Sequence, residues 1–358
     1  MDHSLFAMIC CQNGAQGAVL PEVERDGWRL AFSRPGFVTV KNDRATDRLP
    51  RGVFVRTASW SIGKTSGSDS AAMISEVAAL LTKTKLSFDQ MHVWPRDRVP
   101  IGKFGFEPGA DEVTIAIATA IAGGLPRSQL RNPIPNQLAK PGEKVLDVIL
   151  VDPANWWIGW HEVPKSAAKR GTAHLSSTSW PGGVQPIVPT VPVVSRAYYK
   201  AAEAIAWSGF ELSSGDLAVE VGSSPGGACG RLLELGLRVI GIDPGDMDPV
   251  IVEHPNFTHI RARAGDIPRR EFRGAKWLFV DSNVRPDQSL STVENIVTSR
   301  DTSIEGMILT LKLGGFEHAD RIPGWIKTVK SWGASDIRIR NLARGKVEVC
   351  LAAKLIPQ

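Results

Sequence analysis

Hydrophobic and polar positions follow different patterns in the two halves of the chain. In the first half, apolar or alternating runs such as residues 5–11 and 144–152 are interleaved with helical periodicity, as at residues 68–84. This texture is typical of an α+β region, and its mixed order predicts no single parallel sheet. The apolar stretch 113–125 is too short to span a bilayer and predicts a buried helix rich in alanine and isoleucine.

The pattern becomes regular after residues 165–192, which are rich in serine, glycine and proline and predict a domain boundary. A helix is expected at 195–209, with Ser195 as its N-cap. Apolar strands, most of them separated by helices, are expected at 216–222, 238–243, 257–262, 275–281 and 306–313, before two closing strands joined by a short turn around Ala343 to Gly345. This order predicts an α/β fold with a doubly wound, Rossmann-like sheet whose last strand is antiparallel.

Composition and charge exclude few classes of function. The 358 residues carry a net charge of +5 and a pI near 9.1, which suits a polyanionic partner without requiring one. Four cysteines without a C-x-x-C pair and seven histidines without ligand spacing indicate neither a metal site nor a disulfide framework. We therefore expect a reducing, cytoplasmic location, and the first residues lack the basic region of a secretory signal.

A glycine-rich loop, EVGSSPGG at 220–227, follows the first strand of the second half. Glycine permits a tight turn, and the helix that follows offers unpaired N–H groups, so a nucleotide-like cofactor is expected. Asp243 ends the second strand, where it can accept from ribose hydroxyls, and Asp266 follows the third, where it can accept from an adenine amino group. A nicotinamide dehydrogenase would share these acidic strand ends, but Pro225 is foreign to its G-x-G-x-x-G loop.

One lysine, Lys312, lies within the apolar strand MILTLKLGGF, where lysine is seldom buried unless it is paired or functional. Asp281 ends the fourth strand and Lys312 lies near the end of the fifth, so both are expected at the carboxyl edge of the sheet. The reversed last strand brings Glu348 to the same edge, and Lys200, from the preceding helix, is a further candidate. Each residue alone is more often an ordinary surface residue, but together, beside a cofactor loop, they predict a site.

These residues resemble a known pattern. Lys200, Asp281, Lys312 and Glu348, in this order and with the glycine loop between the first two, resemble the Lys-Asp-Lys-Glu catalytic tetrad of the RrmJ/FtsJ-type ribose 2′-O-methyltransferases. The resemblance implies S-adenosylmethionine as cofactor. The cofactor-binding residues expected on this basis are Ser195, Glu220, Gly222, Ser224, Pro225, Gly226, Gly227, Asp243, Asp266 and Asp281. The family's loop usually begins with aspartate, whereas the longer Glu220 stands here.

The residue chemistry can be argued independently of the resemblance. A ribose 2′-hydroxyl is a poor nucleophile until its proton is taken, so a neutral Lys312 amine suits the role of general base. Lys200 would orient the hydroxyl and disfavour protonation of Lys312, while Asp281 and Glu348 would position the two lysines. Methyl transfer needs mainly alignment, so no metal is expected.

A second resemblance extends over nearly the whole chain. The segment CCQNGAQGAVLPEVE, a middle part ending in VLDVILVDPANWWIGWHEV and the SRAYYK helix are similar to the RlmM family, which methylates a cytidine ribose of bacterial 23S rRNA. The similarity implies 23S rRNA or a large-subunit precursor as partner, and no membrane. The domains it implies are a small α+β domain at 1–55, a THUMP-like RNA-binding domain at 56–165, a linker at 166–192 and a Rossmann-like methyltransferase domain at 193–358.

Two groups of residues are candidates for RNA contacts. Tryptophans can stack on bases, although they more often fill a core, and basic side chains can contact phosphates. The first group comprises Trp156, Trp157, Trp160, Lys165, Lys169 and Arg170. The second group, near the cofactor loop, comprises Arg261, Arg263, Arg269, Arg270 and Arg273.

Other functions compete with this prediction. A ribose methyltransferase of tRNA or of an mRNA cap would carry the same tetrad. A catalytically silent RNA-binding module is disfavoured because all four tetrad positions are filled. A base methyltransferase is disfavoured because the fourth strand ends in DSNV and not in an Asn/Asp-Pro-Pro-aromatic sequence.

Overall fold

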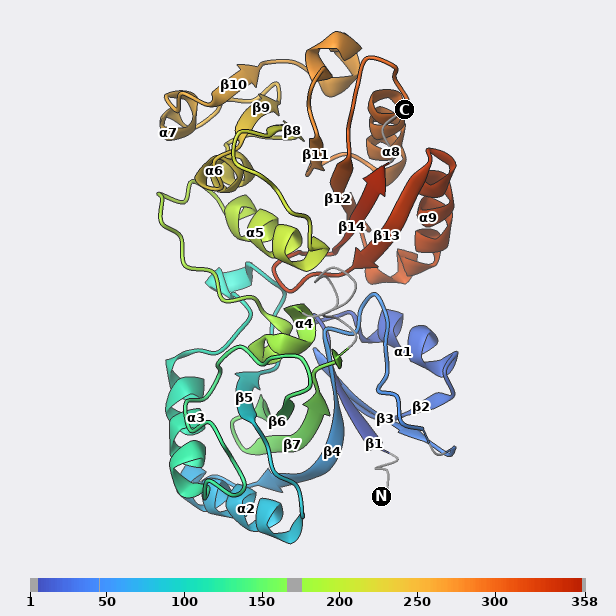
Figure 1. Ribbon diagram of the computed structural model, residues 1–358. Helices are drawn as coiled ribbons and strands as arrows, with labels where there is room; N and C mark the ends of the chain where they lie inside the picture. Colours follow the sequence, from blue (N-terminus) through green and yellow to red (C-terminus); the bar gives the residue numbers. More distant parts are fainter. Residues whose placement is uncertain (1–5, 45, 166–175, 356–358) are drawn as a thin grey trace. The chain divides into compact units, whose positions relative to one another are not determined.

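The computed structural model describes residues 6–44, 46–165 and 176–355. The chain divides into two compact units, Met1–Pro186 and Ile187–Gln358, which Figure 1 shows with the labels used below. The division falls inside the stretch expected as a linker, 166–192, of which residues 166–175 lie outside the described part of the chain.

A seven-stranded sheet forms the first unit, in the order β2-β3-β1-β4-β7-β6-β5. Its pairs are antiparallel except β5 with β6, which is the mixed arrangement that the α+β texture predicts. Because β1 pairs with β4, one sheet crosses the expected boundary between 1–55 and 56–165, and two separate domains there stay a prediction. The strands are β1 (Phe6–Cys10), β2 (Trp28–Arg34), β3 (Phe37–Asn42), β4 (Thr57–Ser66), β5 (Gln90–Pro95), β6 (Lys144–Asp152) and β7 (Asn155–Glu162).

Helices α2 (Ser70–Lys83) and α3 (Glu112–Gly124) pack on one face of this sheet. Asp69 and Asp111 cap them, since each carboxylate accepts a backbone N–H of the first turn. The expected helix at 113–125 is confirmed, but only one side of it is buried, and Val113 is 67% exposed. Shorter elements of this unit are α1 (Gln16–Glu24), α4 (Ser176–Ser179), and the 3₁₀ turns η1 (Lys103–Gly105) and η4 (Pro181–Gly183).

The second unit contains another seven-stranded sheet, in the order β10-β9-β8-β11-β12-β14-β13. Strands β8 to β12 are parallel to one another, whereas β14 is antiparallel to both β12 and β13. The predicted antiparallel last strand is therefore confirmed, and it lies inside the sheet and not at its edge. The strands are β8 (Leu217–Val221), β9 (Arg238–Ile242), β10 (Phe257–Ile260), β11 (Trp277–Val280), β12 (Gly306–Lys312), β13 (Ala334–Arg340) and β14 (Glu348–Leu355).

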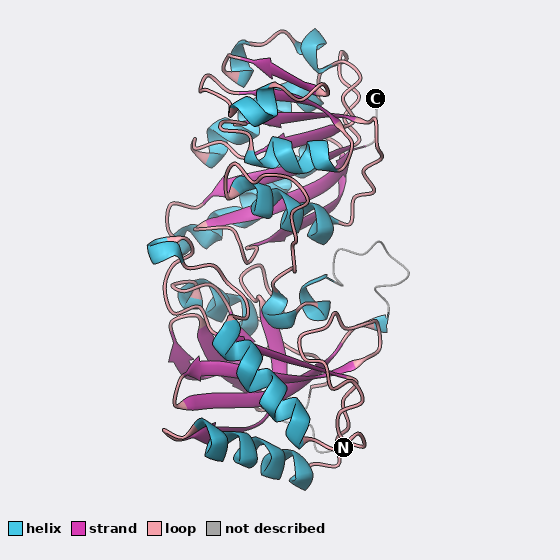
Figure 2. Cartoon of the chain, turned by 90° about the vertical axis from the view of Figure 1, so that its left-hand side faces the viewer, coloured by secondary structure: helices cyan, strands magenta, loops and turns pink. Residues whose placement is uncertain are grey.

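Helices cover both faces of the second sheet, as Figure 2 shows. The connections β8 to β9 and β11 to β12 run in opposite directions, so right-handed crossovers place their helices on opposite faces. The larger helices are α5 (Ala197–Ser208) packed beside α6 (Gly227–Glu234), and α8 (Pro286–Val297) packed beside α9 (Ile322–Ser331). The shorter ones are α7 (Pro249–Val252), η5 (Ala264–Asp266), η6 (Arg269–Phe272) and η7 (Phe316–Arg321).

The strand order reverses between the neighbouring strands β8 and β11. In open α/β sheets, ligands bind in the crevice outside the carboxyl ends of the strands at such a point. A ligand site is therefore expected at the loops after Val221 and Val280. No helix in the described residues is long and apolar enough to cross a membrane.

Candidate active site

Three of the four expected catalytic residues stand at strand ends on one edge of the second sheet. Asp281 directly follows β11, and Lys312 is the last residue of the parallel neighbour β12. Glu348 is the first residue of β14 and is paired across the ladder with Lys312. Because β14 is antiparallel, its first residue meets the last residue of β12, as the sequence pattern predicts.

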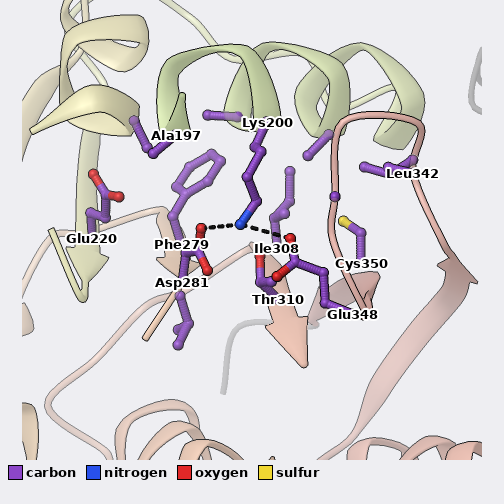
Figure 3. Close-up of a pocket in the computed structure, with 15 residues that line it drawn as sticks. Ala197, Lys200, Glu220, Phe279, Asp281, Ile308, Thr310, Leu342, Glu348 and Cys350 are labelled. Atoms are coloured by element: carbon purple, nitrogen blue, oxygen red, sulfur yellow. Dashed lines mark hydrogen bonds and ion pairs between the residues drawn. The ribbon is translucent and has the colours of Figure 1, made fainter. Parts of the chain in front are cut away.

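The four side chains form a closed ring in which each lysine contacts both carboxylates. Lys200 Nζ lies 2.5 Å from Asp281 Oδ2 and 2.7 Å from Glu348 Oε1. Lys312 Nζ lies 2.7 Å from Asp281 Oδ1 and 2.6 Å from Glu348 Oε2. Two positive and two negative charges therefore compensate one another in a partly desolvated place. Figure 3 shows Lys200 pointing from its helix between the two carboxylates.

The two lysines differ in their exposure. The Lys312 side chain is 25% exposed and that of Lys200 is 17% exposed, whereas Glu348 is only 6% exposed. Lys200 comes from α5, which covers the sheet, whereas Lys312 ends β12 at the carboxyl edge of the sheet. Of the two lysine side chains, that of Lys312 is therefore the more exposed.

The ring shifts the protonation of its members. Burial alone would lower the pKa of Lys200, but the carboxylates of Glu348 and Asp281 outweigh it and hold that pKa well above its usual range. Burial alone would raise the pKa of Asp281, but Lys200 and Lys312 keep it below its ordinary value. In the ring as it stands, Lys200 is a persistent ammonium and Asp281 a persistent carboxylate.

Two polar residues that the sequence analysis missed hold the chain next to Glu348. Glu203, buried on α5, accepts hydrogen bonds of 2.8 Å from the backbone N–H groups of Ala343 and Arg344. Asn341 Nδ2 donates to the Glu348 carbonyl oxygen at 2.7 Å. The connection between β13 and β14 covers residues 341–347, longer than the expected short turn, and these bonds fix its path.

A small cavity of about 40 Å³ lies behind the ring, between α5 and the sheet. Its walls are mostly apolar, and its polar lining residues are Lys200, Glu220, Asp281, Thr310 and Glu348, as Figure 3 shows. Apolar or weakly polar lining residues include Ala197, Ala201, Ala204, Phe279, Ile308, Leu342 and Cys350. The apolar part of this lining lowers the local dielectric constant on one side of the ring, which strengthens the ion pairs within it.

The glycine loop after β8 is shaped by close backbone packing. Gly222 has a φ of +85°, and a Cβ there would lie 2.6 Å from the carbonyl oxygen of Asp281. A Cβ on Gly227 would lie 2.1 Å from Ser195 Oγ. Glycine at these two positions brings the loop against β11 and against the start of α5, so the expected cofactor loop adjoins the ring.

Glu220 lies in β8 and is buried. Burial, with smaller contributions from Asp281 and Asp243, raises the pKa of its carboxyl to about 8. Cys229 Sγ donates a hydrogen bond of 2.8 Å to Glu220 Oε2. At neutral pH this carboxyl is therefore largely protonated, which sets it apart from the charged residues of the ring.

The other expected cofactor residues also lie around this crevice. Asp243 follows β9, and one of its carboxylate oxygens accepts from Gly245 N at 2.7 Å. Asp266 is exposed in η5, shortly after β10. Ser195 Oγ accepts from Ala197 N at 3.3 Å, but α5 begins at Ala197 with Arg196 as its N-cap, so the predicted N-cap at Ser195 is wrong by one residue. Ser224 Oγ donates to Asp246 O at 2.7 Å, and Pro225 and Gly226 lead into α6.

The residues expected to contact RNA have mixed surroundings. Trp156 is buried in the core of the first unit, whereas Trp157 and Trp160 are partly buried. Lys165 Nζ lies 3.8 Å from Glu162 Oε1, and Lys169 and Arg170 lie outside the described residues.

In the second unit, Arg261 pairs with Asp246, Arg270 with Glu271 and Arg273 with Asp301. Arg263 is exposed, and the Arg269 guanidinium lies over the ring of Phe272. A role of either group in RNA binding stays a prediction.

Comparison with known proteins finds similarity to methyltransferases. The FtsJ-like methyltransferase family matches residues 193–299, a range that contains Lys200, the glycine loop and Asp281. The ribosomal RNA large subunit methyltransferase M of Aromatoleum aromaticum is 29% identical over 162 residues, 43% of this chain and 40% of that protein. The protein of the same name from Azoarcus sp. is 27% identical over 224 residues, 60% of this chain and 57% of that protein.

The chain thus spans about half the length of the curated relatives it matches. Among solved structures, the fibrillarin pre-rRNA processing protein of Methanococcus jannaschii aligns with 44% of this chain and 75% of its own, at 11% identity and a TM-score of 0.36, too low for a functional argument. The second unit of the chain therefore contains an FtsJ-like methyltransferase domain.

Proposed function

We propose that this protein is an S-adenosylmethionine-dependent RNA ribose 2′-O-methyltransferase that acts on a cytidine of 23S rRNA, free or in a large-subunit precursor. The observation that carries the proposal is the closed ring of Lys200, Asp281, Lys312 and Glu348 at the carboxyl edge of the sheet. The names of the curated relatives support the choice of large-subunit rRNA. Such a substrate agrees with a cytoplasmic location.

In this proposal the ring activates a ribose 2′-hydroxyl. An alcohol of this kind needs a proton acceptor close to its oxygen before it becomes a competent nucleophile. Lys312 takes that role in its neutral form, because its side chain is the more exposed of the two lysines and ends β12 at the carboxyl edge of the sheet. Its Nζ accepts the hydroxyl proton, while Asp281 and Glu348 stabilise the resulting ammonium at 2.7 and 2.6 Å.

Lys200 has a different part in the same scheme. Its raised pKa keeps it charged, and the positive charge favours the partial negative charge that develops on the attacking oxygen. Because Lys200 also contacts both carboxylates, it holds the ring in one arrangement. The main remaining requirement for an in-line methyl transfer is alignment of the attacking oxygen with the methyl group.

The residues around the crevice fit S-adenosylmethionine. When bound, this cofactor supplies a methyl group activated by its sulfonium. The carboxylates of Asp243 and Asp266 follow neighbouring strands β9 and β10, where they would accept from ribose hydroxyls and from the adenine amino group. Ser195 and the loop from Ser224 to Gly227 would line the methionine side, next to Glu220, Gly222 and Asp281.

The first unit would bind the RNA. We propose that it comprises a small N-terminal domain (1–55) and a THUMP-like domain (56–165), joined by a linker at 166–192 to the methyltransferase domain at 193–358. The basis is the similarity of the sequence to the RlmM family, together with the basic pI near 9.1.

The test is transfer of a labelled methyl group to rRNA that lacks its own ribose methylation, followed by alkaline digestion. A 2′-O-methyl group blocks alkaline cleavage, so the proposal expects label in alkali-resistant dinucleotides with the wild-type chain and none with Lys312→Ala. Label confined to mononucleotides would mean base methylation. Methyl transfer only to tRNA or to capped RNA would mean that this RNA, and not 23S rRNA, is the substrate. Binding of rRNA without methyl transfer would indicate a non-catalytic RNA-binding module.

A further inference from the structure

The first unit has an open patch of sheet that the proposed methyl transfer leaves without a role. It is lined by residues of β1, β2, β3, β4, β6 and β7 and forms a concavity of about 460 Å³, in the size range of about 300–1,000 Å³ typical of ligand sites. Four of its residues define what we name the aromatic patch: Phe32, Arg34, Lys64 and Trp157. Figure 1 shows these strands in the lower part of the view.

Two aromatic rings form the floor of the aromatic patch. The rings of Phe32 and Trp157 are stacked, with centroids 5.7 Å apart and planes 25° apart. Trp157 also packs against the buried Phe37, at 5.4 Å between centroids, which anchors it to the core. Phe32 is 37% exposed on strand β2, so an aromatic surface is presented to solvent from a rigid base.

Each ring has a cation over it. The Arg34 guanidinium lies over Phe32 at 5.7 Å from its centroid, and Lys64 Nζ lies over Trp157 at 5.5 Å, so a stacked base would displace these side chains toward its phosphates. Both basic side chains are exposed. The acidic residue of the concavity, Asp152, is paired with Arg96 at 2.9 Å, so its charge is already compensated. Among the residues that the structure describes, Arg34 and Lys64 form no ion pair, so the aromatic patch combines aromatic rings with positive charge.

We propose that the aromatic patch binds unpaired nucleotides of the RNA substrate, with a base stacked on Phe32 and Trp157 and the adjoining phosphates at Arg34 and Lys64. Proteins hold single-stranded nucleic acid with this combination, because every base has a π face and every linkage a negative charge. A duplex buries its base faces, so the patch selects single-stranded loops or ends. The inference rests on the proposed function for its RNA, and assigns that RNA a site far along the sequence from the tetrad.

The test measures binding of a fluorescent single-stranded oligoribonucleotide to the full chain. Phe32→Ala is expected to weaken binding about five- to hundredfold, the range that stacking of one base on an aromatic ring covers. Arg34→Gln and Lys64→Gln should each lower the slope of log affinity against log salt concentration by about 0.7. Phe104→Ala is the matched control, because Phe104 is 88% exposed in the same unit and has Lys103 Nζ 5.1 Å from its ring, yet lies outside the patch.

The outcomes separate this inference from the proposed function. Unchanged oligonucleotide affinity in Phe32→Ala, or an equal loss in Phe104→Ala, would overturn the aromatic patch even if the wild-type chain methylates rRNA. Weaker binding by Phe32→Ala alone would support it even if no methyl transfer is found. If Phe32→Ala changed the oligomeric state by light scattering and left affinity intact, the patch would be a contact between copies of the chain, and the RNA site would be rejected.

Discussion

Lys200 and Glu203 lie one turn apart on α5, and together they hold the side chain of Glu348 and the backbone that leads to it. Lys200 Nζ is 2.7 Å from the Glu348 carboxylate, while Glu203 accepts from the N–H groups of Ala343 and Arg344 at 2.8 Å each. Residues three apart on a helix share one face, so a single turn reaches both places. The position of α5 and the geometry of the ring are therefore linked.

Glu203→Gln should disturb the ring without touching it. The amide keeps one oxygen acceptor and turns an NH₂ group toward N–H donors, so one buried hydrogen bond is lost, at a cost of about 1–3 kcal/mol in unfolding free energy. We expect a lower kcat for methyl transfer with an unchanged dissociation constant for the cofactor, because the cofactor loop is on other elements. Glu294→Gln on the exposed side of α8 is the control and should leave kcat unaltered. An unchanged kcat in Glu203→Gln would mean that the connection does not position Glu348.

Replacing each lysine of the ring by arginine separates the two roles proposed for them. Arginine keeps the positive charge but stays protonated in proteins, so it cannot accept a proton. Lys312→Arg should therefore lose about 10²- to 10⁴-fold in methyl transfer, the usual contribution of a general base. Lys200→Arg, whose charge is its function, should lose much less.

Cofactor binding and thermal unfolding are the controls for these two variants, since a folded chain that binds S-adenosylmethionine isolates the chemical step. Equal losses in Lys200→Arg and Lys312→Arg would show that the ring does not distinguish a base from a fixed cation. Full activity in Lys312→Arg would exclude Lys312 as the base.

The sequence predicts the ring better than it predicts what supports the ring. Strand ends and strand direction follow from local patterns, and they are enough to bring Asp281, Lys312 and Glu348 to one edge. Glu203 stands out in the sequence as an acidic residue among alanines on a predicted helix. Its hydrogen-bond partners, however, lie 140 and 141 residues away, and no periodicity of the sequence encodes these contacts. The position of β14 between β12 and β13 could not be predicted for a similar reason, since a hairpin pattern does not specify which of its two strands pairs with the rest of the sheet.

Gly222→Ala should damage both the fold and the site. Its φ of +85° disfavours a side chain, and the new Cβ would meet backbone atoms of Asp281 and Ser282 at less than 3 Å. Gly274→Ala is a matched control, because Gly274 has a φ of +77° and nothing within 4 Å of the added Cβ. The control should lose only about 1–2 kcal/mol of unfolding free energy, the cost of the backbone conformation. Gly222→Ala should lose more, together with methyl transfer; equal losses would mean that the loop yields to the added methyl group.

Glu220 gives the second unit a pH-dependent stability of predictable sign. Its pKa rises from 4.5 to about 8 on folding, mainly because of burial, so the folded state prefers the protonated carboxyl. The stabilisation relative to the ionised form is complete below pH 4.5 and is lost as the pH rises toward 8. Other groups that face it, Cys229, Asp281 and Asp243, are common to wild type and variant and cancel in a comparison.

Glu220→Gln removes this titration while keeping an acceptor for Cys229 Sγ. The unfolding free energy of the variant should therefore increase relative to that of the wild type between pH 5 and pH 8. The increase should reach a few kcal/mol, since each unit of pKa difference is worth about 1.4 kcal/mol. Urea unfolding of both chains at pH 5, 6.5 and 8 at constant ionic strength measures the difference. Parallel pH profiles would mean that Glu220 ionises as freely in the folded chain as in the unfolded one. A widening gap would instead identify Glu220 as a neutral acid beneath the cofactor loop at physiological pH, where it lies beside the charged ring without adding a third negative charge to it.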